Sequence, residues 1–351
     1  MIGGSCRQGY LDYLIAQRNI QYDKSEAKKD RNRFWILHDF LISENREKYG
    51  DGEFEQTLTL VTQTSIEHVH ALTMLSNAWD GPISLAVLIY EGQLDYGMKT
   101  LLSLFYEFPK IKSNTTLHLV IYKSNSKKES EYSLAYHHGN VYDTSFLNAN
   151  PGPRLPYPGN LLRNVALSSV QNGFVLMTDI DLVPSLGLHD QFLHFIKNES
   201  IGISNKTAYV VPAFEAMNDS MLARDKSQLL VLQEKGYVRP FGNGSCQSCY
   251  ALTDFKKWSS TQDNNKLSYS IKRRNRKYEP FYILNKNVYP YFDERFKGRH
   301  RDRVSQVHSF CVLSRFFFYF PRCISPTSSQ MRHYVCDCAY GVLKLTSKKY
   351  P

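Results

Sequence analysis

The chain has 351 residues, of which 42% are hydrophobic and 13% aromatic, enough apolar material for one large domain or two packed halves. This composition excludes a fibrous or disordered chain. The formal net charge of +10 favours polyanionic ligands such as nucleotides, anionic membranes or acidic glycans, and does not choose between them.

Alternating apolar patterns predict the secondary structure. Residues 1–55 are charged and weakly periodic, which predicts a helical or irregular lead-in outside the core. Strands are then predicted at 57–61, 83–90, 116–122 and 173–177, and helices at 66–79, 94–108 and 160–171. The connection 123–159 is rich in Ser, Asn, Pro and Gly, and is either a functional loop or an insertion. The alternation predicts an α/β fold with a mainly parallel sheet covered by helices on both faces.

Two aspartates follow the last predicted strand. Because Ile180 points the other way, the side chains of Asp179 and Asp181 share one side of the strand end. Ligands of parallel α/β folds bind beyond the carboxyl ends of the strands. Two hard oxygen ligands at that place suit Mg²⁺ or Mn²⁺ bridging to a nucleotide diphosphate. The alternative is a pair of carboxylates that caps the following turn and holds no ligand.

The cysteines and glycosylation sequons bear on the compartment. The seven cysteines cannot all pair within the chain, and their spacing gives no convincing zinc site. Cys246 and Cys249 form either a short-range disulfide or two plain thiols, in preference to a redox centre. Five N-glycosylation sequons, where roughly two or three are expected by chance, favour the secretory pathway; they lie at Asn114, Asn198, Asn205, Asn218 and Asn243. No apolar run near the N-terminus reaches the ~18–20 residues of a membrane span.

Several linked motifs point to one family. They are Thr57-Leu-Thr-Leu-Val-Thr-Gln63, Trp79-Asp-Gly-Pro-Ile-Ser84, Leu162-Arg-Asn-Val-Ala166, Thr178-Asp-Ile-Asp-Leu-Val-Pro-Ser185, Tyr209-Val-Val-Pro-Ala-Phe-Glu215, Tyr278-Glu-Pro-Phe281 and Tyr291-Phe-Asp-Glu-Arg-Phe296. In this order, over about residues 56–312, they resemble glycosyltransferase family 49, which includes glucuronyltransferases of dystroglycan glycan synthesis. The segment from Cys246 to Trp258 also resembles the glucuronyltransferase branch.

The resemblance implies a Rossmann-like fold of the GT-A type with a mixed, mainly parallel central sheet. It further implies a UDP-sugar donor, with glucuronate as the expected sugar, and Mn²⁺ (or Mg²⁺) held by Asp179 and Asp181. Inversion at the anomeric carbon and a glycan or glycoprotein acceptor are also implied. The family resides in the Golgi lumen behind an N-terminal membrane anchor. A nucleic-acid partner is not expected, because the net positive charge of the chain is the one feature that favours it.

The resemblance also implies that Gln63, Arg163 and Asn164 bind the donor, together with Asp179. The fork of Arg163 suits a phosphate or carboxylate, and a helix-face ion pair is its alternative role. An inverting transfer also needs a carboxylate base. Glu215, Glu279, Asp293, Glu294 and Asp302 are the acids considered. Asp302 and Asp293 rank first as catalytic candidates, with an ion pair to Arg295 or Arg303 as the structural alternative for either.

The chain departs from the family pattern in two places. Gly298-Arg299-His300 stands where the family has a Gly-aromatic-Gly turn. The resemblance ends after about Val312, and the family's metal-binding histidine would fall near Thr327, with His333 a poor substitute. The predicted organisation is therefore a lead-in or stem (1–55), a GT-A-like domain (56–312) and a divergent tail (313–351). The alternative to an active transferase is an impaired relative that binds glycan or a partner enzyme.

Overall fold

The computed structural model describes part of the chain, and the statements below concern that part. The described residues are 34–47, 57–123, 157–198, 207–217, 223–243, 246–261, 271, 277–296, 303–307, 318–319 and 342–345.

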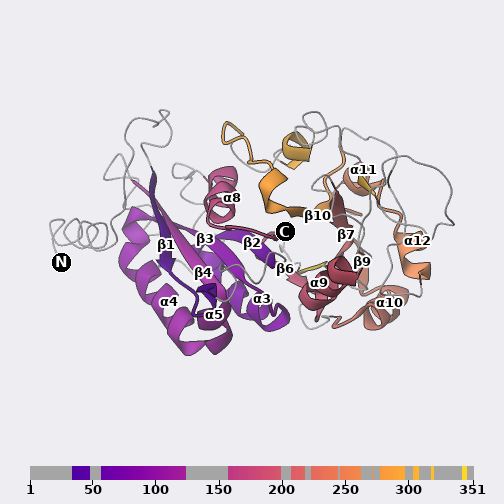
Figure 1. The fold of residues 1–351 in the computed structure, drawn as a ribbon, viewed down its shortest axis with the longest axis horizontal. Coiled ribbons are helices and arrows are strands. Elements are labelled where there is room, and N and C mark those ends of the chain that lie inside the picture. Colours follow the sequence, from indigo (N-terminus) through magenta and orange to yellow (C-terminus); the bar gives the residue numbers. More distant parts are fainter. Residues whose placement is uncertain are drawn as a thin grey trace, which may run out of the picture.

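Among these residues, eight strands form the central sheet, in the order β1-β4-β3-β2-β5-β10-β7-β11 (Figure 1). Its middle is parallel and consists of β4 (Thr115–Tyr122), β3 (Ile83–Tyr90), β2 (Leu58–Ser65) and β5 (Phe174–Met177). The strand β3 is buried along its whole length, as expected of a parallel strand with helices on both faces. The predicted α/β fold with a mixed, mainly parallel central sheet is confirmed.

Antiparallel strands extend the sheet at both sides. On one side β10 (Phe281–Asn285) lies between β5 and β7 (Ala208–Val211) and is antiparallel to both, and β11 (Phe318–Tyr319) follows in parallel with β7. The strand β10 thus brings residues from the second half of the chain next to the strand that ends before Asp179. This insertion is what assembles the site described below.

The prediction of a helical or irregular lead-in was wrong for residues 34–41. They form β1 (Phe34–Leu41), which pairs antiparallel with β4. Leu37 and Phe40 are buried in the main core. The strand is hard to recognise from sequence because His38 and Asp39 interrupt its apolar run, and Asp39 has a positive φ of 53° where the register shifts.

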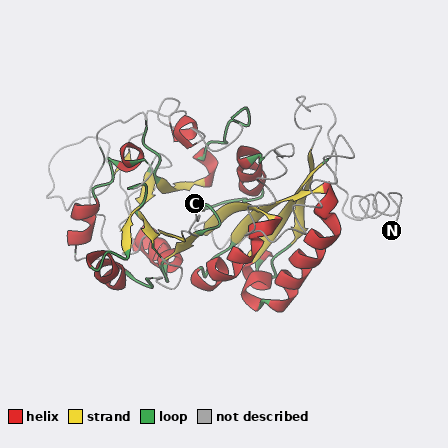
Figure 2. Cartoon of the chain, turned by 180° about the vertical axis from the view of Figure 1, so that it is seen from behind, coloured by secondary structure: helices red, strands yellow, loops and turns green. Residues whose placement is uncertain are grey.

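Helices cover both faces of the parallel strands. Figure 1 shows α3 (Leu72–Ala78), α4 (Leu94–Glu107) and α5 (Pro109–Asn114) on one face and α8 (Gly159–Ser168) on the other. The predicted helix at 66–79 is divided into a 3₁₀ turn, η2 (Ile66–Ala71), and α3, and a second 3₁₀ turn, η3 (Glu91–Gln93), precedes α4. Figure 2 shows the same arrangement of helices around the strands from behind.

A tight turn links α8 to β5. Gly173 in this turn has a φ of +83°, and a Cβ atom there would lie 2.3 Å from the carbonyl oxygen of Thr57. Only glycine fits both the left-handed backbone and this close approach of the turn to β2. The turn therefore fixes the register in which β5 enters the sheet.

A second, smaller sheet lies beyond the first and has the order β6-β12-β8-β9. Its strands are β6 (Leu182–Pro184), β12 (Val342–Leu345), β8 (Ala213–Ala216) and β9 (Val238–Pro240). A separate core around Phe214 and Trp258 packs beside it. The associated helices and turns are α9 (Leu188–Asn198), α10 (Lys226–Glu234), α11 (Gln247–Tyr250), α12 (Phe255–Ser260) and η4 (Lys286–Val288).

Within the described ranges, no helix is both long enough and apolar enough to cross a membrane.

Candidate functional site

Asp179 and Asp181 lie where β5 ends and the chain turns into β6. The backbone N–H of Thr178 still donates to Val61 of β2, and the N–H of Leu182 donates back to the carbonyl of Asp179. Ile180, between the two aspartates, is buried, whereas both aspartates are only partly buried. The turn thus presents two carboxylates at the carboxyl edge of the parallel strands, where ligands of such folds bind.

Two arginines converge on Asp179. Nη2 of Arg163 lies 3.2 Å from Oδ1 of Asp179, and Nη2 of Arg303 lies 2.9 Å from the same oxygen. The arginine side chains are 9% and 12% exposed, and the aspartate side chain is 30% exposed. With Asp181 two residues away, the site holds two positive and two negative charges, so the arginines can neutralise the aspartates or a bound anion.

Each guanidinium also lies over an aromatic ring. The centre of the Arg163 guanidinium is 5.2 Å from the ring centroid of Phe292, and that of Arg303 is 4.3 Å from the ring of Phe281. Such cation–π contacts hold the planar groups in place at little entropic cost. Phe281 begins β10, so the inserted antiparallel strand supplies the support for Arg303.

The helix α8 is tied to residues 292–294 by amide side chains. Oδ1 of Asn164 accepts from the N–H of Phe292 (2.8 Å), and Nδ2 of Asn164 donates to the Phe292 carbonyl and to Oε1 of Glu294 (2.9 Å each). Asn160 donates to the carbonyl of Asp293 (2.8 Å) and accepts from Nη1 of Arg163 (3.0 Å). The amide of Asn164 therefore serves to position the segment that carries Phe292.

Gln63 lies near the end of β2 and is buried. Its side-chain oxygen accepts a hydrogen bond from the hydroxyl of Tyr157, which precedes α8. This contact orients the Gln63 amide at the carboxyl edge of the sheet. Sequence reasoning named Gln63 and missed Tyr157, because 94 residues separate them.

Of the two predicted bases, Asp293 and Asp302, the structure describes Asp293. The carboxylate of Asp293 is held by Arg295, whose Nε lies 2.9 Å and 3.0 Å from its two oxygens. This is one of the ion pairs expected as the structural alternative. Asp302 lies outside the described residues. Glu215, also considered, is buried and accepts from Nε of Arg239 (2.8 Å) and the N–H of Gly242 (3.0 Å).

Tyr250 ends the short helix α11, near enough to Asp179, Arg303 and Glu215 for their charges to act on its hydroxyl. Burial raises the pKa of its hydroxyl, the charge of Arg303 lowers it, and the charges of Glu279, Asp179 and Glu215 raise it. Its ring fills the space beside Gly242, where a Cβ atom would lie 2.4 Å from a ring carbon. Tyr250 is therefore a neighbour of the site that motif reading did not identify.

A disulfide lies at the start of the short helix that carries Tyr250. Cys246 and Cys249 are bonded, with their Cα atoms 5.3 Å apart. The carbonyl of Cys249 accepts from the N–H of Glu279 at 2.8 Å. The bridge closes the turn at the start of the short helix that ends at Tyr250, and the hydrogen bond from Glu279 ties this helix to the segment leading into β10.

The short helical segment at 303–307 carries Arg303 to the site. The hydroxyl of Tyr282 donates to Oε1 of Gln306 (3.0 Å), and Nε2 of Gln306 donates to the carbonyl of Pro290 (3.0 Å). Burial raises the pKa of the neighbouring Tyr289 to about 12, opposed by its hydrogen bond to Tyr282. A buried polar network therefore anchors Arg303, which sequence reasoning considered only as a partner for the predicted bases.

The described residues contain no group of three or more His, Cys, Asp or Glu side chains placed to hold a metal ion. Of the sequons, Asn114 accepts from Nδ2 of Asn45 (3.0 Å) and Asn243 accepts from Nε2 of Gln247 (2.9 Å). Asn198 ends α9. Asn205 and Asn218 lie outside the described residues, as do Thr327 and His333.

Comparison with known proteins gives a consistent set of relatives. Residues 57–319 match the family model described as "Glycosyl-transferase for dystroglycan". Beta-1,4-glucuronyltransferase 1 of Danio rerio is 28% identical over 335 residues, which cover 89% of this chain and 76% of that protein. The Mus musculus protein of the same name is 32% identical over 268 residues, covering 71% of this chain and 62% of that protein. The match thus spans less than two thirds of the mouse relative's length.

Among solved structures, TarS 1–349 of S. aureus in complex with UDP is similar at 13% identity and a TM-score of 0.36. The similarity covers 83% of this chain and 61% of that one.

Proposed function

The chain belongs to the family of glycosyltransferases for dystroglycan, glycosyltransferase family 49, and from this membership we propose that it transfers a sugar from a UDP-sugar to a glycan or glycoprotein acceptor with inversion. The donor we propose is UDP-glucuronate, because the curated relatives named above are glucuronyltransferases. One observation carries the proposal: Asp179 and Asp181 lie at the carboxyl edge of the sheet with two arginines beside them.

The arginine pair suits a donor that carries several negative charges. A UDP-glucuronate donor brings a diphosphate and a sugar carboxylate, and planar guanidinium groups bind both kinds of anion through paired hydrogen bonds. Arg163 and Arg303 are largely buried, so their fields are less screened than those of surface arginines. Gln63 and Tyr157 form the other donor-side pair in the proposal, and Asn164 acts through Phe292, which lies under Arg163.

We propose that Asp179 and Asp181 hold Mn²⁺ or Mg²⁺. The residues fit such an ion, because divalent cations at nucleotide sites are commonly bound by one or two carboxylates together with substrate phosphates. When bound, the metal neutralises charge on the departing diphosphate. Donor phosphates would share the coordination of the ion and so contribute to the affinity for the metal.

Asp302 and Asp293 remain the proposed bases for the acceptor hydroxyl. Asp293 can act only if its carboxylate leaves Arg295, whose side chain is 87% exposed and therefore able to move. Asp293→Asn should then lower the transfer rate by about a hundredfold or more while UDP binding stays unchanged. Equal losses of UDP binding and transfer would instead indicate that Asp293 only supports the segment that follows it.

A Golgi-lumenal location is proposed from the relatives, with attachment to the membrane through an anchor of the kind that the family has. The disulfide between Cys246 and Cys249 supports a secretory compartment, because such bonds persist where the surroundings are oxidising. Treatment of the protein from secretory cells with an N-glycosidase, followed by mass measurement, tests this part of the proposal.

Calorimetric titration with UDP, with and without Mn²⁺, is the direct test of the donor site. Metal-dependent binding by the intact chain that is lost in Asp181→Ala supports it, and UDP-glucuronate, UDP-xylose and UDP-N-acetylglucosamine are then compared for metal-dependent hydrolysis. The second candidate is an impaired relative that binds glycan or a partner enzyme, favoured by the ion pairs that already engage Asp179. Absence of metal-dependent UDP binding in the intact chain would refute the donor site, and binding of a glycan or partner would then be the activity to measure.

A further inference from the structure

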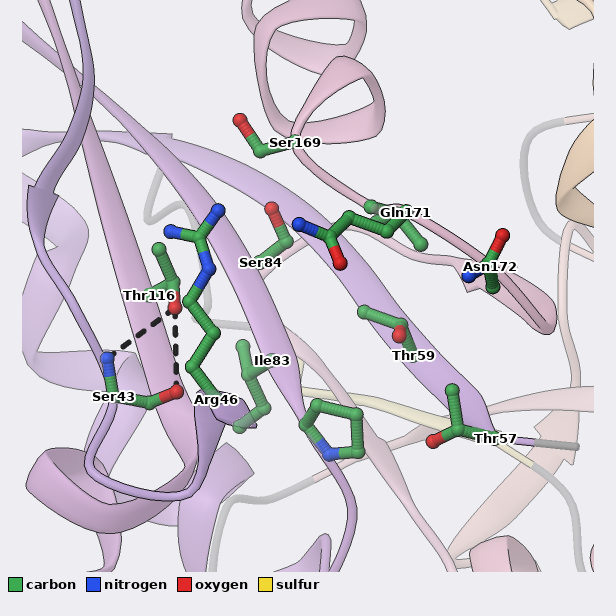
Figure 3. Close-up of a pocket in the computed structure, with 12 residues that line it drawn as sticks. Ser43, Arg46, Thr57, Thr59, Ile83, Ser84, Thr116, Ser169, Gln171 and Asn172 are labelled. Atoms are coloured by element: carbon green, nitrogen blue, oxygen red, sulfur yellow. Dashed lines mark hydrogen bonds between the residues drawn. The ribbon is translucent and has the colours of Figure 1, made fainter. Parts of the chain in front are cut away.

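A second polar pocket lies at the opposite edge of the sheet, where the parallel strands begin (Figure 3). Thr59 of β2, Ser84 of β3 and Thr116 of β4 line it, together with Ser169 and Gln171 from the turn between α8 and β5. Asp179 follows the other end of β5, roughly 17 Å away along the strand direction, at about 3.3 Å for each residue. The pocket is therefore separate from the site around Asp179.

The lining is rich in groups that both donate and accept hydrogen bonds. Figure 3 shows the hydroxyls of Ser84 and Ser169, the amide of Gln171 and the guanidinium of Arg46 gathered around the same space. Serine and threonine hydroxyls can do both, so they are best matched by a ligand whose own groups do both. Pro82, Ile83 and Val170 add a small apolar strip, and sugars present hydroxyl edges together with C–H faces.

The charges of the described pocket residues and of their ion-pair partners balance. Among the described lining residues Arg46 carries the one formal charge, and its Nη1 lies 2.7 Å from Oδ2 of Asp39. The buried His118 beneath the pocket is neutral, since burial lowers its pKa to about 3. Burial also lowers the pKa of His38. The balance favours an uncharged ligand over a phosphate or a carboxylate.

A serine, a histidine and an aspartate lie in the order of a catalytic triad here: Ser84, His118 and Asp39. In a triad the histidine nitrogen that faces the serine must be unprotonated, and in His118 that nitrogen carries the proton. The backbone N–H of Asp39 donates to Nδ1 of His118 (2.9 Å), so the neutral ring carries its proton on Nε2. That N–H points at the hydroxyl of Ser84 (2.9 Å), which itself donates to the carbonyl of Ala166 (2.7 Å). The network holds Ser84 in place and does not activate it, so the pocket is a binding site without chemistry.

We propose that this pocket binds one neutral sugar unit, at a distance from the metal-binding aspartates. The space between its lining side chains is about 510 Å³ when the open mouth is counted, so a single sugar unit would bind at the mouth and stay partly in contact with solvent. The guanidinium of Arg46, oriented by Asp39, and the amide of Gln171 provide paired hydrogen bonds to neighbouring sugar hydroxyls. The site does not depend on the donor or reaction proposed above.

The test is saturation-transfer NMR with methyl glycosides of glucose, galactose, mannose, xylose and N-acetylglucosamine at millimolar concentration. Saturating UDP and Mn²⁺ are present, so that the site at Asp179 is occupied. Arg46→Met and Gln171→Ala each remove a pocket contact and should weaken binding about tenfold. Lys112→Met is the matched control, since Lys112 is an ion-paired cation of similar exposure, in the helix that leads into β4, and is not among the described residues that line the pocket.

Asp181→Ala separates this site from the donor site. Binding of at least one neutral glycoside that survives Asp181→Ala and Lys112→Met but is weakened in both pocket variants supports the proposal. The proposal is overturned if no glycoside of the panel binds. It is also overturned if Asp181→Ala abolishes glycoside binding while Arg46→Met leaves it unchanged. Displacement of the glycoside by inorganic phosphate would overturn the assignment to a neutral ligand. Thermal unfolding of each variant shows whether it still folds. Gln171→Ala should keep the native fold, because the side chain of Gln171 is exposed.

Discussion

Asn164→Asp is a small chemical change at the point where α8 holds residues 292–294. In the native protein Asn164 accepts from the N–H of Phe292 and donates to the Phe292 carbonyl and to the Glu294 carboxylate. The aspartate keeps the accepting oxygen and replaces the donating nitrogen with a second oxygen. Both donated hydrogen bonds are lost, and a carboxylate then faces a carbonyl oxygen and another carboxylate.

The expected loss can be worked from these contacts. Two hydrogen bonds, one of them to a charged group, contribute about 2–4 kcal/mol. Two like charges about 4 Å apart repel by up to about 4 kcal/mol near a protein surface, and partial exposure of Glu294 reduces this. We therefore expect the free energy of unfolding to fall by about 4 kcal/mol, a large part of the ~5–15 kcal/mol of an ordinary domain.

Urea denaturation at pH 7, followed by tryptophan fluorescence, measures this loss. Asn287→Asp is the control, because it makes the same change on an exposed residue and should cost less than about 0.5 kcal/mol. Adding Glu294→Gln to Asn164→Asp removes the repulsion and supplies an amide donor, and should restore about 2 kcal/mol. The reasoning is refuted if Asn164→Asp unfolds within about 1 kcal/mol of the native chain, or if the second change restores nothing.

Three further outcomes are expected. Burial lowers the pKa of His118 to about 3, so its stabilising effect is complete above pH 6.5 and is lost as the pH falls below that value. From pH 7 to pH 5 the native chain should lose about 2 kcal/mol that His118→Gln does not lose, and equal pH slopes in denaturation would contradict this. Cys246→Ser opens a four-residue loop and should lower the free energy of unfolding by about 2 kcal/mol, which calorimetry compares with the reduced native chain. Tyr157→Phe leaves Gln63 without its hydroxyl donor and should weaken UDP binding about fivefold; an unchanged titration would remove Gln63 from the donor site.

The parallel core and the aspartate pair could be predicted from the sequence, because both are local patterns. The apolar run from Ile83 to Tyr90 can be buried on both faces only as a strand within a covered sheet. Two aspartates directly after such a strand must lie at the edge of the sheet where ligands bind. The strand β1 was not predicted, because His38 and Asp39 interrupt its apolar pattern. Residues 34–41 form a strand nevertheless, because they pair with β4.

Only the tertiary structure determined what surrounds Asp179. Arg303 lies 124 residues further along the chain, and it reaches Asp179 because β10 inserts next to β5 and carries Phe281 beneath the guanidinium. Asn164 and Phe292 are joined in the same way across 128 residues. Such contacts depend on which strands become neighbours, and the packing of the whole sheet sets this. The sequence alone indicated the four parallel strands and the two carboxylates after β5, because these are local patterns.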